Sequence, residues 1–427
     1  MNVQSRPARP ETQTSAAERE PLRSAFSVLG DTSFRRYFVG QTCSAFGSAL
    51  STVALAFAVL SLTRSAVALG VVLAGSRLPQ IIFALLGGAL GDRFSRRLIM
   101  LSTDAFRALL QAATAATLIL HAADLPLIAA LQILSGVGSA MFAPAANGLV
   151  NNLAPDGRNR EATSMLGFAA NAASISGLAV AGAIVGALGP GPAFAVDAAT
   201  FAVSTLSLAL IDARSLAKPL LARRGLIADI GEGWRTVRQA RWLLTHCIYV
   251  CLLNTLALCP FFVLGPLIAS RRLGGAPAWA AIAIAWTVGS LAGNITTTRW
   301  QPRRPIVMAI ALSIGLIPIL VSLALPLTLG LVLATAVPAG AESAISSTLV
   351  LVALQDNIPD HLLARATSFE TIGSLIAVPL GMSFAGIAAT WSNTQSVLLF
   401  SATWVLLSSI VALATPSVRR LQTSDQR

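Results

Sequence analysis

Two charged residues lie in the middle of long apolar runs, where their chemistry would be unusual. Arg77 lies midway along residues 66–90, and Glu342 lies midway along residues 327–354. A charge at that depth in a bilayer costs about 2.5–3.5 kcal/mol, so each must face a partner or a water-filled cavity. The two can pair across such a cavity. Alternatively, Glu342 alone binds and releases a proton, since withdrawal from water penalises an ionised carboxylate. A third interpretation is that both residues have a purely structural role.

A second set of charged residues lies nearer the ends of apolar runs. Asp104 and Arg107 are three residues apart, so they share one helix face and can form a local salt bridge. Asp197 lies near the end of its run, where it is either a helix-end acid or a member of a proton relay. His246 titrates in the physiological range, but it lies at the edge of its run, and we expect no proton role for it.

The elements that must position these residues are membrane-spanning helices. The chain has 427 residues, of which 55% are hydrophobic and 11% charged, whereas a soluble protein has about 25% charged residues. Twelve apolar stretches of about 20 residues or more can be marked. They are 37–62, 66–90, 98–120, 125–149, 163–188, 191–211, 243–268, 276–298, 305–325, 327–354, 366–390 and 395–415. We predict an all-α membrane protein with twelve transmembrane helices.

The distribution of arginine predicts how these helices are oriented. With the N-terminus in the cytoplasm, the outer loops hold only Arg64, Arg271 and Arg272, and most other arginines lie inside. The positive-inside rule then places both termini in the cytoplasm. The net charge of +12 comes from inter-helix loops and not from a basic face, so we expect anionic lipid headgroups and no nucleic acid as partners. The polar N-terminus has no signal-peptide core, and we expect no cleavage.

Two loops share a pattern that indicates an internal repeat. Pro155-Asp156 is followed, after five residues, by Ala-Thr-Ser, and so is Pro359-Asp360. The alternative is that cytoplasmic loops look alike because all need turn residues and arginine. Duplicated halves with the site at their interface are common in secondary transporters. We therefore predict two pseudo-symmetric six-helix bundles at 34–212 and 243–415, a central cytoplasmic loop at 213–242, and polar cytoplasmic tails at 1–33 and 416–427.

One short loop carries the most specific pattern in the chain. Residues 88–97 read Gly-Ala-Leu-Gly-Asp-Arg-Phe-Ser-Arg-Arg between two apolar runs. This spacing resembles the loop signature of the major facilitator superfamily, with Ser95 where glycine is usual. A loop that only sets topology needs the arginines alone. The resemblance implies instead a cytoplasmic gate, in which the acid pairs with arginines or approaches a helix N-terminus, formed by Gly88, Asp92, Arg93, Arg96 and Arg97.

The resemblance extends along the chain to a bacterial branch of enterobactin-exporter-like and macrolide-efflux-like permeases. It is carried by segments 34–41, 142–145, 193–198 and 232–235. It implies alternating access and, usually, export driven by a proton gradient. Leu178 stands where many drug–proton antiporters of the superfamily have proline, which keeps open an importer or uniporter of a small metabolite. On the helices that line the cavity in this fold, the candidate pathway residues are Gln41, Asn147, Asn254 and Trp286.

Other functions lack the residues they need. Lys218 is the only lysine, and no glycine loop precedes it, so a Walker A site for ATP is absent. The four cysteines have no metal-binding or redox spacing. We predict no enzyme, no catalytic residue, no metal and no cofactor. The predicted protein is a monomeric secondary transporter of the bacterial inner membrane, a proton-coupled exporter of a small hydrophobic or amphipathic compound such as a drug, antibiotic or siderophore-like molecule.

Overall fold

The computed structural model describes residues 28–90, 95–153, 158–211, 235, 237–300, 302–419 and 421. In these ranges every regular element is helical and no strand occurs. The physical reason is that a bilayer offers no hydrogen bonds to the backbone, so a single helix must satisfy its own N–H and C=O groups. The predicted all-helical fold class is confirmed.

Six long helices form the first bundle. They are α3 (Thr32–Thr63), α4 (Ala66–Leu90), α5 (Arg96–Ile119), α6 (Leu125–Leu153), α7 (Asn159–Leu188) and α8 (Pro190–Ala209). Asp31 caps the start of α3, where its carboxylate accepts a 2.8 Å hydrogen bond from the Phe34 N–H. Gly189, with a φ of +82°, makes the turn from α7 into α8.

The second bundle contains continuous α-helices and two helical runs that are interrupted by π-helical or 3₁₀ turns. The continuous helices are α12 (Ala276–Arg299), α15 (Leu329–Asn357), α16 (Asp360–Trp391) and α17 (Thr394–Ala414), followed by the short α18 (Pro416–Arg419). The apolar run predicted at 243–268 forms a longer helical segment, from Arg241 to Leu273. It consists of α10 (Arg241–Leu253), the π-helical turn η3 (Asn254–Leu258), α11 (Cys259–Ile268) and a second π-helical turn η4 (Ala269–Leu273). The predicted run 305–325 consists of α13 (Pro305–Leu312), the 3₁₀ turn η5 (Ser313–Leu316) and α14 (Ile317–Ala324).

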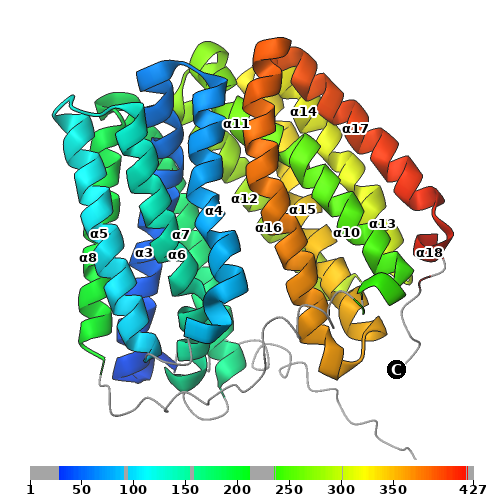
Figure 1. Cartoon of the computed structure of the whole chain (residues 1–427), viewed down its shortest axis with the longest axis horizontal. Coiled ribbons are helices and arrows are strands. Elements are labelled where there is room, and N and C mark those ends of the chain that lie inside the picture. Colours follow the sequence, from blue (N-terminus) through cyan, green and yellow to red (C-terminus); the bar gives the residue numbers. More distant parts are fainter. Residues whose placement is uncertain are drawn as a thin grey trace, which may run out of the picture.

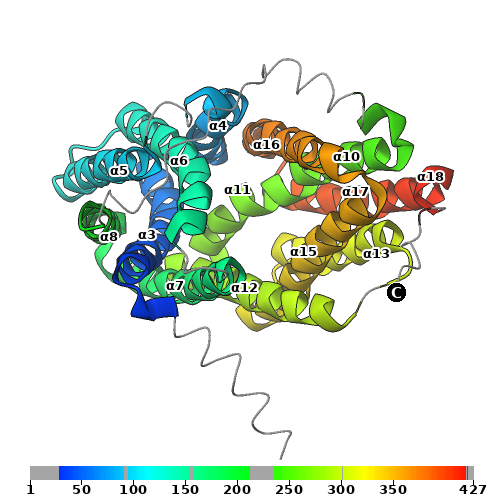
Figure 2. The same cartoon turned by 90° about the horizontal axis from the view of Figure 1, so that it is seen from below.

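The two bundles lie side by side, with α3 to α8 on one side and α10 to α17 on the other (Figures 1 and 2). We call the end where α3 begins the terminal end and the opposite one, where Gly189 and Gly274–Gly275 make turns, the turn end. In Figure 1 the bundles come together toward the turn end, at the top, and diverge toward the terminal end.

Glycines allow the bundles to meet closely at the turn end. A Cβ atom on Gly70 of α4 would lie 2.3 Å from the Met382 carbonyl oxygen of α16, and one on Gly386 would lie 2.6 Å from the Ala66 carbonyl oxygen. Between α7 and α12, a Cβ atom on Gly182 would lie 2.8 Å from the Ala280 Cβ atom. All these contacts involve the first turns of one helix and the last turns of the other. The structure is therefore closed between the bundles at the turn end.

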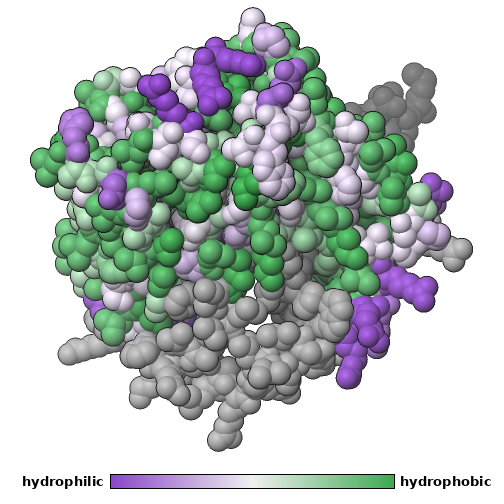
Figure 3. Space-filling model, turned by 45° about the horizontal axis from the view of Figure 1, so that its top comes forward, coloured by the Kyte–Doolittle hydropathy of each residue, from purple (hydrophilic) through white to green (hydrophobic). Residues whose placement is uncertain are grey.

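The outer surface is suited to lipid. In Figure 3 hydrophobic residues dominate the visible face, and hydrophilic residues gather mainly along its upper edge and at its lower right. Within the described residues, nine helical segments are long and apolar enough to cross a membrane. The predicted spans 66–90, 98–120 and 366–390 form α4, α5 and α16 but are not among these nine. The count of twelve membrane crossings stays a prediction.

Candidate functional site

A cavity of about 490 Å³ lies between the two bundles, and we call it the central cavity. Helices α3, α4, α5 and α6 of the first bundle contribute to its wall, and η3, α11, α12 and α16 contribute from the second. Its charged lining residues are Arg77 of α4 and Arg107 of α5. Hydroxyl and amide side chains lie beside them, and the remainder of the wall is largely apolar.

Arg107 is held by groups behind the cavity wall. Its Nη1 atom lies 3.9 Å from Oδ1 of Asp104, and its guanidinium group lies 3.9 Å above the centre of the Phe201 ring. Asp104 is completely buried, and its Oδ2 atom accepts a 2.6 Å hydrogen bond from the Ser204 hydroxyl of α8. The salt bridge expected from the three-residue spacing is thus present. A buried carboxylate needs such partners, because unpaired burial of its charge is costly.

A second buried acid lies beside this cluster, where it interacts electrostatically with Arg107 and is hydrogen-bonded to a chain of two amides. Asp197 of α8 is completely buried, and its Oδ2 atom accepts a 2.8 Å hydrogen bond from Nε2 of Gln111. Oε1 of Gln111 accepts in turn from Nε2 of Gln132, at 3.0 Å. Asp197 is therefore a member of a buried network and not a solvated helix-end acid. The sequence did not predict either glutamine as its partner.

Gly47 makes room for this network on α3. A Cβ atom at Gly47 would lie 1.9 Å from Oγ1 of Thr200 and 2.4 Å from Oδ1 of Asp197. Atoms cannot approach that closely, so any larger residue would force the side chains of Thr200 and Asp197, or the helices that carry them, to move. We call Asp104, Arg107, Gln111, Gln132 and Asp197 together the first-bundle network.

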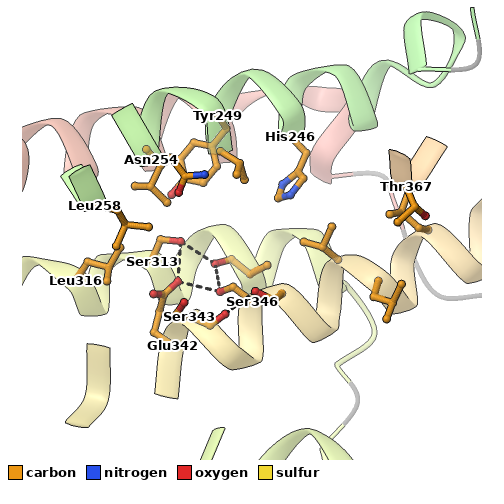
Figure 4. Close-up of a pocket in the computed structure, with 17 residues that line it drawn as sticks. His246, Tyr249, Asn254, Leu258, Ser313, Leu316, Glu342, Ser343, Ser346 and Thr367 are labelled. Carbon is orange, nitrogen blue, oxygen red and sulfur yellow. Dashed lines mark hydrogen bonds between the residues drawn. The ribbon is translucent and has the colours of Figure 1, made fainter. Parts of the chain in front are cut away.

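A second cavity, of about 340 Å³, lies inside the second bundle, and we call it the Glu342 cavity (Figure 4). Glu342 of α15 is 6% exposed. Its Oε1 atom accepts hydrogen bonds from the hydroxyls of Ser313, at 3.0 Å, and Ser346, at 2.9 Å. Within the described ranges no arginine, lysine or histidine forms a salt bridge with it. Its partners are therefore neutral hydroxyl groups alone.

His246 and Tyr249 of α10 also line the Glu342 cavity. The Tyr249 hydroxyl forms a 2.9 Å hydrogen bond with the Ser409 hydroxyl of α17. His246 is 3% exposed, and its Nδ1 atom has no hydrogen-bond partner among the described residues. The sequence placed His246 at the edge of its run and did not predict that it shares a cavity with Glu342.

The π-helical turn η3 lies between the two cavities. Asn254 and Leu258, its first and last residues, line both of them. The Cys259 N–H bonds the Asn254 carbonyl, five residues back. Pro260 has no N–H to give to the Leu256 carbonyl, which favours a local widening of the helix. Such turns are frequent at functional sites, and Pro260 was the sequence signal for this one.

Aromatic side chains line a third cavity, of about 390 Å³, between α3, α7, α11 and α12. Trp286 stacks on Phe261, with ring centroids 5.2 Å apart and an interplanar angle of 25°. Phe262 and Trp279 line both this cavity and the central one. These rings give the cavity a largely apolar wall.

The predicted pathway residues are distributed unevenly. Asn254 lines the central cavity, and Trp286 lines the third cavity, between α3, α7, α11 and α12. Gln41 lines none of the three cavities, and its Nε2 atom is buried without a hydrogen bond among the described residues. The side chain of Asn147 lies outside the described part. Arg77 lines the central cavity and Glu342 its own cavity, and no ion pair joins them in the described structure.

The predicted gate is described only in part. Asp92 and Arg93 lie outside the described residues, and Gly88 is described only as part of the α4 backbone. Nη1 of Arg96 donates to the Gly148 carbonyl near the end of α6, at 2.8 Å, and Nε of Arg97 donates to the Leu208 carbonyl near the end of α8, at 2.8 Å. A cation suits the end of α8 because the last four carbonyls of a helix lack partners within it.

Ser95 has a local role in the same region. Its hydroxyl accepts a 3.2 Å hydrogen bond from the Leu98 N–H and so caps α5. A serine in the usual glycine position of the motif thus provides a helix cap.

A family comparison agrees with this architecture. The model of the Major Facilitator Superfamily matches residues 37–369. The chain belongs to this superfamily. The resemblance expected from the loop motif is confirmed, and membership indicates a multi-pass membrane transporter of small molecules rather than an enzyme.

Individual relatives are distant but cover nearly the whole chain. The chain is 26% identical over 401 residues to the multidrug efflux pump Tap of Mycolicibacterium fortuitum, covering 91% of this chain and 97% of the relative. It is 23% identical over 408 residues to macrolide efflux protein A of Streptococcus pyogenes, again covering 91% and 97%.

Solved structures share the fold. The nucleoside transporter NupG superposes with a TM-score of 0.73 at 11% identity, covering 90% of this chain and 98% of that one. An auto-inhibited peptide transporter of the POT family superposes with a TM-score of 0.69 at 13% identity, covering 92% and 98%. At such identities the likeness concerns the fold and not the substrate.

Proposed function

We propose that this superfamily member exports a small hydrophobic or amphipathic compound across the inner membrane in exchange for protons. The observation that carries the proposal is the environment of Glu342, a buried carboxyl group beside a cavity with only hydroxyl partners. Such a group can gain and lose a proton without breaking an ion pair. The relatives named as multidrug and macrolide efflux proteins support the export direction.

The closed turn end supports an alternating-access cycle. With both termini in the cytoplasm, as the arginine distribution predicts, the cavities belong to an inward-open state. The compound would enter the central cavity from the cytoplasm, and the bundles would then rock about their glycine contacts. Glu342 would take up a proton from outside and release it inside, so that each return of the carrier moves a proton down its gradient.

The loop 88–97 would control the cytoplasmic side in this cycle. Arg96 and Arg97 hold α5 to α6 and α8 within the first bundle. Asp92 would be the acid that closes the gate against the second bundle. Asp92→Asn keeps the size and removes the charge, so it should lower transport strongly at unchanged membrane abundance. Unchanged transport would leave the loop with a topological role alone.

Everted membrane vesicles test the exchange directly. Uptake of a panel of fluorescent amphipathic compounds, with cationic, neutral and anionic members, is measured with and without an imposed pH gradient, acidic inside. Stimulation by the gradient, abolished by an uncoupler, is expected. Accumulation that is insensitive to the gradient would contradict proton exchange.

Cysteine labelling tests the orientation. In a variant without the four native cysteines, a cysteine placed beside Gly189 should react with an impermeant maleimide in intact cells. A cysteine at Lys218 should react only after the membrane is opened. Labelling of the second position in intact cells would overturn the proposed sidedness.

An importer or uniporter on the same fold is the alternative, because fold does not set direction. Leu178, in place of the proline of many antiporters, favours it. This alternative predicts that intact cells that express the protein accumulate the substrate, whereas export predicts that these cells contain less of it than cells without the protein.

A further inference from the structure

The central cavity has an imbalance of charge that bears on its cargo. Among the described residues, its lining includes two arginines, Arg77 and Arg107, and no aspartate or glutamate. Glu342, a buried acid of the second bundle, lines a different cavity. The inference drawn from this imbalance rests on the proposed function in one respect, namely that the central cavity holds the compound that is carried.

The two arginines differ in how their charge is compensated. Arg107 lies 3.9 Å from Asp104, and Asp197 lies behind the wall in the same network. Both acids are completely buried and do not line the cavity. Arg77 has no hydrogen bond or ion pair with any described residue, and its side chain is exposed. The surplus charge on the cavity wall is therefore that of Arg77.

The neutral polar groups of the wall do not compensate for this charge. The hydroxyls of Ser51 and Thr52 donate to the Ser48 carbonyl, and the Ser139 hydroxyl donates to the Ser135 carbonyl. These groups are neutral, and none of them forms a hydrogen bond with Arg77 among the described residues. A guanidinium group that has no protein partner and faces a largely apolar wall can bind an anion, because hydrogen bonds between charged groups are stronger than those between neutral groups.

The other side of the cavity is apolar. Phe262, Trp279, Val378 and Met382 of the second bundle contribute to it. A volume of about 490 Å³ lies within the range of pockets for drug-sized ligands. Its wall thus presents an unpaired cation on the first bundle and aromatic and aliphatic surface on the second.

We propose that the central cavity binds an amphiphile with one anionic group, a carboxylate, sulfonate or phosphate, which Arg77 contacts while the apolar body lies against Phe262 and Trp279. Cargo and proton then use separate groups. The anion binds at Arg77, and the proton binds at Glu342 across the turn η3. The cargo consequently does not compete with the proton for a shared carboxylate.

Three probes with one apolar body test this preference. They are 4-(1-pyrenyl)butyrate, the corresponding pyrenylbutanol and the corresponding pyrenylbutyl trimethylammonium ion. Their dissociation constants are measured by energy transfer from tryptophan to pyrene, using the full chain in nanodiscs of zwitterionic lipid, with empty nanodiscs subtracted. The anionic probe should bind at least about tenfold more tightly than the alcohol, as expected for a charge-assisted contact. The cationic probe should bind most weakly.

Variants at Arg77 locate the contact. Arg77→Gln should weaken binding of the butyrate about tenfold and leave the alcohol unchanged, whereas Arg77→Lys should retain most of the affinity for the butyrate. Equal weakening of all three probes by Arg77→Gln would overturn the proposal. So would tighter binding of the cationic probe by the unaltered protein, a measurement that does not depend on any variant folding.

These outcomes are independent of transport. Binding is measured without a gradient, so absence of proton-driven export would leave the order of the probes intact. Conversely, proton-driven export with a reversed probe order would preserve the proposed function and refute the anionic cargo.

Discussion

The two bundles handle buried carboxyl groups in different ways. In the first bundle, Asp104 and Asp197 both interact electrostatically with the Arg107 guanidinium group, and serine and glutamine also donate hydrogen bonds to them. In the second, Glu342 has only the hydroxyls of Ser313 and Ser346. A carboxylate with a cationic partner is stabilised in its charged form and holds helices together. A carboxyl group without such a partner is free to change its charge during a transport cycle.

The largest effect is expected at Glu342. Glu342→Gln keeps the hydrogen-bonding shape and removes the exchangeable proton, so it should abolish uphill export driven by a pH gradient and spare downhill exchange. Asp356→Asn, at an exposed position of the same helix, is the matched control. Uptake into everted vesicles is the measurement. If Glu342 only neutralised Arg77, adding Arg77→Gln would restore uphill export. Because the two residues line separate cavities, we expect no restoration.

Removal of Arg107 should have the largest effect on stability. Arg107→Gln leaves Asp104 and Asp197 buried without their cation, and we expect a loss of about 3 kcal/mol in the free energy of unfolding. Chemical unfolding in detergent measures it. Arg158→Gln is the control, since Arg158 pairs with Glu161 at the surface and such pairs contribute about 1 kcal/mol or less. Equal losses in the two variants would mean that the first-bundle network does not hold the helices together.

Gly47 offers a steric way to disturb the first-bundle network. Gly47→Ala would bring a methyl group into the space of Thr200 and Asp197, with an expected loss of about 1–3 kcal/mol. Gly167→Ala in α7 is the control, because a Cβ atom there would meet nothing within 4 Å. Unchanged stability of Gly47→Ala would show that α3 and α8 can separate without cost.

The smallest effect is expected at a single hydroxyl beside Glu342. Ser346→Ala removes a 2.9 Å hydrogen bond to its carboxylate. A contribution of about 1 kcal/mol corresponds to about a fivefold decrease in gradient-driven export. Ser343→Ala, in the same cavity but without a hydrogen bond to Glu342 in the described structure, is the control. A complete loss in Ser346→Ala would assign the serine a direct part in proton transfer.

Local patterns in the sequence were sufficient for the fold class and for some of the charged contacts. Apolar runs predicted the helices, since length and hydropathy are local properties. The spacing of Asp104 and Arg107 predicted their shared face, because three residues make nearly one helical turn. The loop motif predicted the superfamily. Arg77 and Glu342 lie in the middle of their apolar runs, and this position predicted that both need a polar environment.

Relations between helices required the tertiary structure. Arg77 and Glu342 have similar depth, but depth along a helix does not determine the direction in which its side chain points, and their helices direct them into different cavities. For the same reason the amide chain from Asp197 to Gln132, and the position of His246 beside Glu342, depend on how α5, α6, α8 and α10 are rotated and packed. The sequence by itself determined which residues must avoid lipid. Only the packing of the helices decided which of them meet, because helix rotation is set by contacts between residues far apart in the chain.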